Sequence, residues 1–429
     1  MLDNQCVEII QKNIGRNWLI DAVTLDSRQV KAGSLFFALK GSQVDGRQFI
    51  QDVINLGGFA VCDLLGDPSE LPKSDRIVIV PNVHKVICSI ISDIRSLMRL
   101  VIAVTGSSGK TFTTDAIFQA LKSSGAQVYT PGGNYNTEYG IFLALVQVTQ
   151  NINTLVLELG VSKPGDMDVL ARTVKPDMSI ILPISMAHVE NFKDREELIK
   201  EKTKLINYTR GKVVVHESLK ALVKGEIVPY PHTYTFYQNK DEITISGILK
   251  YKGKEYILQN PELSGLHLVE NMLGAITLLE NIVDIDDLII VFNNLHAKDG
   301  RGKFTRIGGI TIYDSSYNAN GGENGSMLSE LRSIHSYEGD IIIVLGGMAE
   351  CGEFSTNEHK RVLQYAETLT EKILLIGENW PECRYKCATL EEISAKLLAL
   401  VSDKCLIMVK GSRKFQLDSL VAHLKLIYV

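Results

Sequence analysis

Short runs of apolar residues alternate with longer segments of mixed polarity along most of this 429-residue chain. Up to about residue 98, runs such as SLFFAL, FAVCD and RIVIV are separated by polar turns, and HKVICSIISDIRSLM is predicted to form a helix. From Leu100 the runs LVIAVTG, TLVLELG and MSIILPIS are separated by stretches of helical length. Strands that alternate with helices imply parallel crossovers, and so we expect an α/β fold whose mostly parallel sheet is covered on both faces.

The pattern changes further along the chain. Residues 209–260 alternate in polarity, with turns expected at Asn239-Lys240 and Lys252-Gly253, which predicts a hairpin-rich insertion. A helix is expected at HLVENMLGAITLLENI. Beyond the polar stretch Gly300-Arg301-Gly302, strands are expected at GGITIYD, DIIIVLGG, KILLIG and CLIMVKG.

The chain is about three times as long as a typical domain of roughly 150 residues, so two or three separately cored domains are expected. We predict three domains. They are a small N-terminal α/β domain over residues 1–98, a central nucleotide-binding domain with a parallel sheet over 99–305, and a C-terminal Rossmann-like α/β domain over 306–429.

Composition and charge narrow the classes of partner. Hydrophobic residues make up 45% and charged residues 22%, as in soluble globular proteins. The net charge of -5 and pI of about 6.0 provide no overall basic field for nucleic acid or anionic lipid. We find no signal segment and no apolar run of membrane-spanning length, and we therefore expect a cytoplasmic protein with no membrane insertion and no nucleic-acid partner, acting as a monomer.

The seven cysteines are scattered and odd in number, which indicates reduced thiols rather than disulfides. Cys383 and Cys387, four residues apart, could share a helix face, but two thiols without a second pair make a poor zinc site.

A glycine-rich loop follows the strand that begins at Leu100 and precedes a helix, TTDAIFQALKSSG. In this setting backbone N–H groups and a helix N-terminus hold phosphate, with a lysine on the β- and γ-phosphates and a hydroxyl on Mg²⁺. The first glycine of the usual pattern is replaced by Val104. The loop, predicted to bind ATP, is TGSSGKT, that is Thr105, Gly106, Ser107, Ser108, Gly109, Lys110 and Thr111.

Two further polar residues follow apolar strands. Glu158 ends TLVLELG and His188 lies just beyond MSIILPIS. Side chains at the carboxyl ends of parallel strands commonly face the ligand crevice, so Glu158 could hold a metal, and His188 could serve as a ligand or a base. Read alone, Glu158 is explained equally well as a solvated charge at a strand end, and His188 is explained better as a solvated or satisfied histidine.

Several motifs together resemble those of the Mur ligase family. They occur in the family's order and approximate spacing: LDSRQVKAGSLFFALKGSQVDGRQFI, TGSSGKT, GNYNTEYG, LELG, AHVENF, GRGKF, DSSYNAN, GGMAECGE and KGSRK. The resemblance covers essentially the whole chain. It implies an N-terminal UDP-sugar-binding domain, a central ATPase domain and a C-terminal ligase domain.

The resemblance implies a role for each matching position around the phosphates. Lys110 and Thr111 would bind phosphate and a first Mg²⁺, and Glu158 and His188 a second. Lys202 matches a family lysine that is carbamylated and so becomes anionic, although from sequence alone it would be one charge on a solvated helix.

Other matching positions are implied to bind the nucleotide or the substrates. On the nucleotide side these are His267 and Asn271 near adenine, Arg301 facing ATP and Asp314 on the ribose. On the substrate side they are Ser27, Arg28, Asp45, Asn134, Asn136, Tyr317, Asn318 and Asn320. The chain departs from the family pattern at Pro183, Leu268, Gly321 and Gly347, and the loop after SYNAN is about three residues longer than usual.

The implied reaction is the ATP-dependent joining of D-alanyl-D-alanine to a UDP-N-acetylmuramoyl tripeptide through an acyl phosphate. Two alternatives stay open. One is another amide ligase of the superfamily, such as the ligase that adds the third peptide residue or a folylpolyglutamate synthase. The other is a nucleotide-gated regulatory ATPase that performs no ligation. The identity of the third residue of the tripeptide is not encoded in any motif that we recognise.

Overall fold

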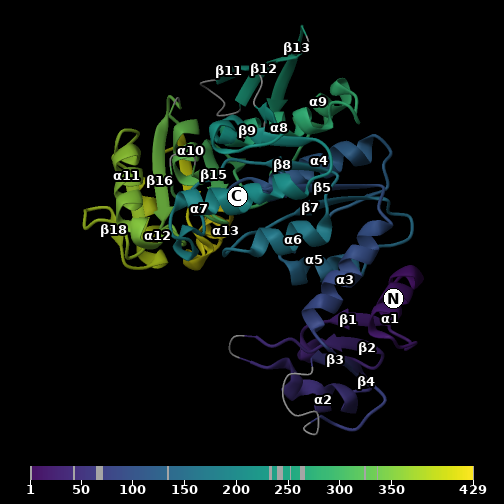
Figure 1. The fold of residues 1–429 in the computed structure, drawn as a ribbon. Helices are drawn as coiled ribbons and strands as arrows, with labels where there is room; N and C mark the ends of the chain where they lie inside the picture. Colours follow the sequence, from purple (N-terminus) through teal and green to yellow (C-terminus); the bar gives the residue numbers. More distant parts are fainter. Residues whose placement is uncertain are drawn as a thin grey trace.

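The computed structural model describes residues 2–41, 44–63, 71–132, 135–230, 234–238, 245–251, 253–260, 266–322, 325–335 and 337–428. These residues form four sheets, three of them predominantly parallel (Figure 1). Within the described chain, no helix is both long enough and apolar enough to cross a membrane.

The N-terminal part holds a four-stranded parallel sheet in the order β1-β2-β3-β4. Its elements are α1 (Asn4–Ile14), β1 (Ala22–Thr24), β2 (Ser34–Phe37), α2 (Ile50–Asn55), β3 (Phe59–Asp63), β4 (Ile77–Val80) and α3 (Val83–Ser96). Helix α3 leads directly into the central sheet.

The central sheet has six strands, all parallel, in the order β10-β9-β8-β5-β7-β6. Its strands are β5 (Leu100–Thr105), β6 (Val128–Tyr129), β7 (Thr154–Glu158), β8 (Met178–Ile181), β9 (Val213–His216) and β10 (Val228–Tyr230). The helices between and after them are α4 (Lys110–Ser123), α5 (Glu138–Leu145), α6 (Asp166–Val174), α7 (Arg195–Thr203), α8 (Leu266–Leu279) and α9 (Ile285–Asn293). The chain leaves β5 toward β6 and β7 on one side and later returns to β8 on the other, so the strand order reverses at β5. Ligands bind at such a switch point in open α/β sheets.

Helices cover both faces of this sheet, as predicted. Helices α4, α8 and α9 enclose one apolar core, while α1, α3, α5 and α6 contribute to the other (Figure 1). The second core is one connected cluster of side chains, and its members range along the chain from Cys6 on α1 to Leu219 beyond β9. Helix α1 packs on α3, and α3 packs on α5 and α6, so these two N-terminal helices share one core with the central part of the chain.

The segment predicted as a hairpin-rich insertion divides into two parts. Strands β9 and β10 extend the parallel central sheet, and only β11 (Tyr234–Gln238), β12 (Ile245–Tyr251) and β13 (Lys254–Asn260) form an antiparallel sheet. The prediction was wrong for residues 213–230, because a buried parallel strand and a hairpin strand have similar compositions. The predicted turns at Asn239-Lys240 and at Lys252 fall outside the described residues.

The C-terminal sheet has six strands in the order β14-β15-β19-β16-β17-β18, parallel except for β14. Its strands are β14 (Lys303–Ile307), β15 (Ile310–Ser315), β16 (Asp340–Gly346), β17 (Ile373–Ile376), β18 (Lys386–Cys387) and β19 (Cys405–Lys410). The helices are α10 (Ser326–Ser333), α11 (Ser355–Glu367), α12 (Leu390–Leu400) and α13 (Leu417–Tyr428). Cys383 lies in a loop and Cys387 in β18, so these two thiols do not share a helix face.

Candidate active site

The phosphate-loop sequence connects β5 to α4 at the switch point of the central sheet. Gly106 and Gly109 have φ angles of 149° and 77°, which side chains rarely tolerate. A Cβ on Gly106 would lie 2.5 Å from Leu182 Cβ, and one on Gly109 would lie 1.9 Å from Asn271 Nδ2. Glycine is therefore required at both positions by backbone conformation and by space. Helix α4 begins at Lys110, three residues earlier than the predicted segment, which places Lys110 and Thr111 in its first turn.

The side chains of this first turn are held in place by neighbours. Lys110 Nζ donates to the carbonyl oxygens of Gly106 (3.2 Å) and Ser107 (3.3 Å), so it lies back over the loop. Thr111 Oγ1 donates to Glu158 Oε2 at 2.9 Å, and Asn136 Nδ2 donates to the other oxygen of Glu158 at 3.0 Å. The carboxylate at the end of β7 thus lies beside the start of α4, as expected from adjacent parallel strands.

Lys202 on α7 reaches the back of the loop. Its side chain is 1% exposed, and Nζ donates to Gly106 O at 3.2 Å. Burial, reinforced by the charge of Lys110, lowers the pKa of Lys202 to about 7. The residue that reads as solvated from sequence is instead a buried amine that is readily neutral.

His188 and Glu350 connect the central and C-terminal sheets. His188 has φ 64°, and its Nδ1 lies 3.2 Å from Glu350 Oε2 in the loop after β16. Burial, together with Lys202 and Lys110, lowers the pKa of His188 to about 4, whereas burial and Glu190 raise the pKa of Glu350. At neutral pH the imidazole is therefore uncharged and can offer a lone pair to a metal ion.

A cavity of about 390 Å³ lies between the phosphate loop and the C-terminal sheet. Most of the residues expected around the phosphates and nucleotide line it, namely Ser107, Ser108, Gly109, Lys110, Thr111, Glu158, His188, His267 and Arg301. Four residues expected on the substrate side also line it, namely Asn136, Tyr317, Asn318 and Asn320. Leu268, which departs from the family pattern, lines the cavity beside His267. Ser108 Oγ lies 3.1 and 2.8 Å from the two amide atoms of Asn320, so the loop directly contacts the segment after β15.

The other expected residues lie behind or away from this cavity. Thr105 is buried and donates to Leu159 O at 2.9 Å. Asn271 is 1% exposed against Gly109, and neither of its amide atoms has a hydrogen-bond partner in the part of the chain that the structure describes. Asp314 accepts hydrogen bonds from Ser316 and from Gly300 N, and it lines an adjoining cavity of about 270 Å³.

The expected substrate residues near the N-terminus form a separate group. Ser27 and Arg28 line a cavity of about 510 Å³ beside β2, and Asp45 pairs with Arg47 at 2.7 Å. Figure 1 shows the N-terminal sheet, in purple, apart from the C-terminal part, in green and yellow. Asn134 lies outside the described residues.

Three ionisable residues of the cavity were missed by sequence reasoning, namely Glu350, Lys410 and Glu330. Lys410 Nζ is buried at the end of β19 and donates to Ser315 Oγ (3.1 Å), Asn318 O (3.1 Å) and Glu330 Oε1 (3.0 Å). Glu330 Oε2 is buried without a hydrogen-bond partner among the described residues. Lys410 could have been found by the rule that singled out Glu158, because it also ends an apolar parallel strand. Glu330 lies within the helical sequence SMLSELRS, which gives no such signal.

Two guanidinium groups lie over the Tyr317 ring. Arg301 is 4.0 Å and Arg413 is 5.2 Å from the ring centre. A flat, cation-flanked aromatic surface beside Asp314 suits a ribose or a base next to a phosphate chain.

Comparison with known proteins agrees with this arrangement. Residues 19–85 match the model of the Mur ligase family catalytic domain, residues 104–279 that of the Mur ligase middle domain, and residues 300–413 that of the Mur ligase glutamate ligase domain. The UDP-N-acetylmuramoyl-tripeptide–D-alanyl-D-alanine ligase of Borreliella burgdorferi is 29% identical over 451 positions, covering 96% of this chain and 95% of that protein.

Two solved structures share the fold along nearly the whole chain. MurF from Acinetobacter baumannii superposes with a TM-score of 0.84 at 22% identity, covering 97% of this chain and 98% of that one. MurF from Thermotoga maritima in complex with ADP gives a TM-score of 0.80 at 23% identity, covering 94% and 97%. With three family domains in order and a cavity formed where the middle and last domains meet, the chain belongs to the Mur ligase family.

Proposed function

We propose that this protein is an ATP-dependent ligase that joins D-alanyl-D-alanine to a UDP-N-acetylmuramoyl tripeptide, giving a UDP-muramoyl pentapeptide. The name of the relative from Borreliella burgdorferi supports this choice of substrates. The single observation that carries the proposal is the shared cavity, in which the phosphate loop of one domain faces buried Lys410 and Glu330 of another. Such a site can hold a nucleotide and a second substrate together and can exclude water when the domains close.

The triphosphate of ATP is proposed to lie along the loop over the N-terminus of α4. The loop supplies backbone N–H groups and a favourable helix dipole, and Lys110 would turn from the carbonyl oxygens it now contacts to the phosphates. Tyr317 and Arg301 would flank the nucleoside, with Asp314 on the ribose. His267 lines the same cavity on the α8 side.

The donor atoms beside the loop fit two Mg²⁺ ions. Thr111 and Glu158 offer oxygen atoms that are now joined by a hydrogen bond, with 2.9 Å between the two oxygens. The uncharged His188 offers a nitrogen atom in the same cavity. We assign the first ion to Thr111 and the phosphates, and the second to Glu158 and His188. Bound there, the ions would offset the negative charge that builds up when a carboxylate approaches the γ-phosphate.

We further propose that Lys202 is carbamylated, which the chemistry of its surroundings supports. At pH 8 an amine with a pKa of about 7 is roughly nine-tenths neutral, whereas one at the ordinary 10.5 is only about 0.3% neutral. A neutral amine can attack CO₂, forming the N–C bond and releasing a proton. The resulting carbamate is anionic and would attract the cations and Lys110, while a bare ammonium would repel them.

Two bond exchanges complete the proposed reaction. An oxygen of the tripeptide carboxylate attacks the γ-phosphorus, the bond to the bridging oxygen breaks, and ADP leaves. The amine nitrogen of D-alanyl-D-alanine then attacks the acyl carbon, and the tetrahedral intermediate loses a proton and phosphate to give the amide. The chain contributes charge neutralisation through Lys110 and orientation through the residues of the cavity.

Phosphate release measured with each substrate omitted in turn tests the proposal. A ligase of this specificity releases phosphate at its full rate only when ATP, UDP-N-acetylmuramoyl tripeptide and D-alanyl-D-alanine are all present. Release that is unaffected by either peptide substrate would instead indicate a regulatory ATPase. Release that requires a free amino acid or a folate would indicate another amide ligase of the superfamily.

A further inference from the structure

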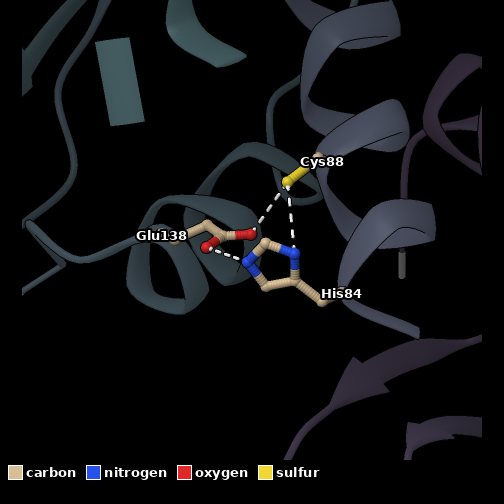
Figure 2. Close-up of side chains that lie close together, drawn as sticks. All are labelled: His84, Cys88 and Glu138. Atoms are coloured by element: carbon tan, nitrogen blue, oxygen red, sulfur yellow. Dashed lines mark hydrogen bonds and ion pairs between the residues drawn. The ribbon is translucent and has the colours of Figure 1, made fainter. Parts of the chain in front are cut away.

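A cluster of three metal-ligating side chains lies away from the nucleotide cavity, between α3 and α5. His84 and Cys88 are one helical turn apart on α3 and so lie on the same face of that helix. Glu138 is the first residue of α5 and points at both of them (Figure 2). The cluster therefore joins the helix that leads out of the N-terminal sheet to a helix that covers the central sheet.

The three groups already have nearly the spacing of a metal site. His84 Nε2 is 2.6 Å from Glu138 Oε2, and Cys88 Sγ is 3.0 Å from Glu138 Oε1 and 3.9 Å from His84 Nδ1 (Figure 2). One ligand atom from each residue can be chosen so that all lie within 4.8 Å of one another. In a tetrahedral site with Zn–S near 2.3 Å and Zn–N and Zn–O near 2.0–2.1 Å, ligand atoms are roughly 3.3–3.6 Å apart. The shortest contact is about 0.7 Å below these separations and the longest is at most about 1.5 Å above them, so small side-chain rotations would produce that geometry.

Protons now occupy the places that a cation would take. The short contacts from the carboxylate to the imidazole nitrogen and to the sulfur each require a hydrogen between the atoms. A divalent ion can replace both contacts. The thiol proton passes to solvent, and the imidazole proton moves through solvent from Nε2, which then binds the ion, to Nδ1, which faces the resulting thiolate.

The surroundings of the cluster allow an ion to enter from solvent and stabilise its positive charge. The His84 side chain is 41% exposed and that of Glu138 12% exposed, so the cluster is open to solvent on the histidine side. The Cys88 thiol now donates to the Glu138 carboxylate, and a bound metal ion would supply the positive charge that deprotonates a coordinating thiol.

We propose that His84, Cys88 and Glu138 bind one divalent transition-metal ion, best matched by Zn²⁺, with water as the fourth ligand. One nitrogen, one sulfur and one oxygen form a set that zinc accepts and that Mg²⁺ and Ca²⁺, which take oxygen ligands, do not favour. The ion would cross-link α3 to α5 and stabilise the contact between the N-terminal and central parts of the chain.

Cobalt titration of the full-length, metal-stripped protein tests this site directly. One equivalent of Co²⁺ should produce a thiolate-to-metal charge-transfer band in the near ultraviolet, and added Zn²⁺ should remove it. Cys88→Ser should abolish the band, and Glu138→Gln, which preserves shape, should weaken Co²⁺ binding more than about tenfold, because even outer-shell substitutions typically cost 10- to 100-fold. Cys383→Ser, at a partly exposed thiol elsewhere, should leave the band unchanged.

The melting temperature provides a second readout. Zn²⁺ should raise that of the wild type and of Cys383→Ser but not that of Cys88→Ser. A band that survives in Cys88→Ser, binding that is unchanged in Glu138→Gln, or the absence of any charge-transfer band would overturn the proposal. Each result is independent of ligase turnover, because none of the three residues lines the nucleotide cavity.

Discussion

Replacement of Lys202 by methionine is expected to make the protein more stable and, at the same time, inactive. The ordinary lysine pKa of 10.5 falls to about 7 in the folded chain. A pKa lower by about 3.5 means that keeping the buried amine protonated costs about 5 kcal/mol well below pH 7, and about 4 kcal/mol at pH 7 itself. Lys202→Met removes this cost but also loses the hydrogen bond to Gly106 O, worth about 1 kcal/mol. We therefore expect a net stabilisation of about 3 kcal/mol at pH 7 in CO₂-free buffer.

The pH dependence follows from the sign of the shift. Since the folded pKa lies below the unfolded one, the unfolded wild type binds more protons between about pH 7 and 10.5. The free energy of unfolding of the wild type should therefore rise across this window, and the advantage of Lys202→Met should shrink toward pH 10. Urea denaturation at a series of pH values measures both trends.

A matched control lies on the same helix. Lys200 is exposed on α7, and Lys200→Met should change neither the stability nor its slope with pH. A Lys202→Met protein that is less stable than the wild type, or that keeps the wild-type slope, would refute the argument from burial.

Lys202→Ala should be inactive and partly restored by small carboxylic acids such as formate, whereas full activity without added acid would exclude a carbamylated ligand.

Three further substitutions test the nucleotide cavity. Lys110→Ala should abolish ligation and leave the circular dichroism spectrum unchanged. Lys122 is exposed on the same helix, and Lys122→Ala should behave as wild type. Near-normal turnover of Lys110→Ala would contradict the phosphate-site assignment. Gly109→Ala should raise the KM for ATP severalfold, because its φ of 77° strains a side chain by about 1–2 kcal/mol and the new methyl group would lie 1.9 Å from an amide nitrogen; an unchanged KM would show that the loop adapts. Glu330→Ala should destabilise the protein by roughly 3–5 kcal/mol, because it leaves the Lys410 ammonium buried without its carboxylate. Adding Lys410→Met should recover much of that loss in urea denaturation, and no recovery would mean that the pair is not the cause.

Local patterns were sufficient to single out several residues that line the cavity beside the phosphate-loop sequence. Apolar strands followed by helices predicted parallel sheets, and parallel strands bring their carboxyl ends to one edge. That rule alone placed Glu158 near the phosphate loop, and the structure puts it 2.9 Å from Thr111. The same rule applies to Lys410, which also ends a parallel strand, but no local pattern shows that the edge of the C-terminal sheet faces the phosphate loop.

Most strands and helices, the phosphate-loop sequence and the order of the family motifs can be predicted from the sequence, because each depends on residues close together along the chain. Which charges are buried emerges only from tertiary packing. Lys202 and Glu330 lie in segments that read as solvated helices, and their burial depends on contacts with Gly106 and Lys410, 96 and 80 positions away. The same holds for the cluster between α3 and α5, where His84 and Cys88 meet Glu138 across 54 and 50 positions. Packing over such separations sets the local dielectric and the partners of each group, and with them its protonation and its chemistry.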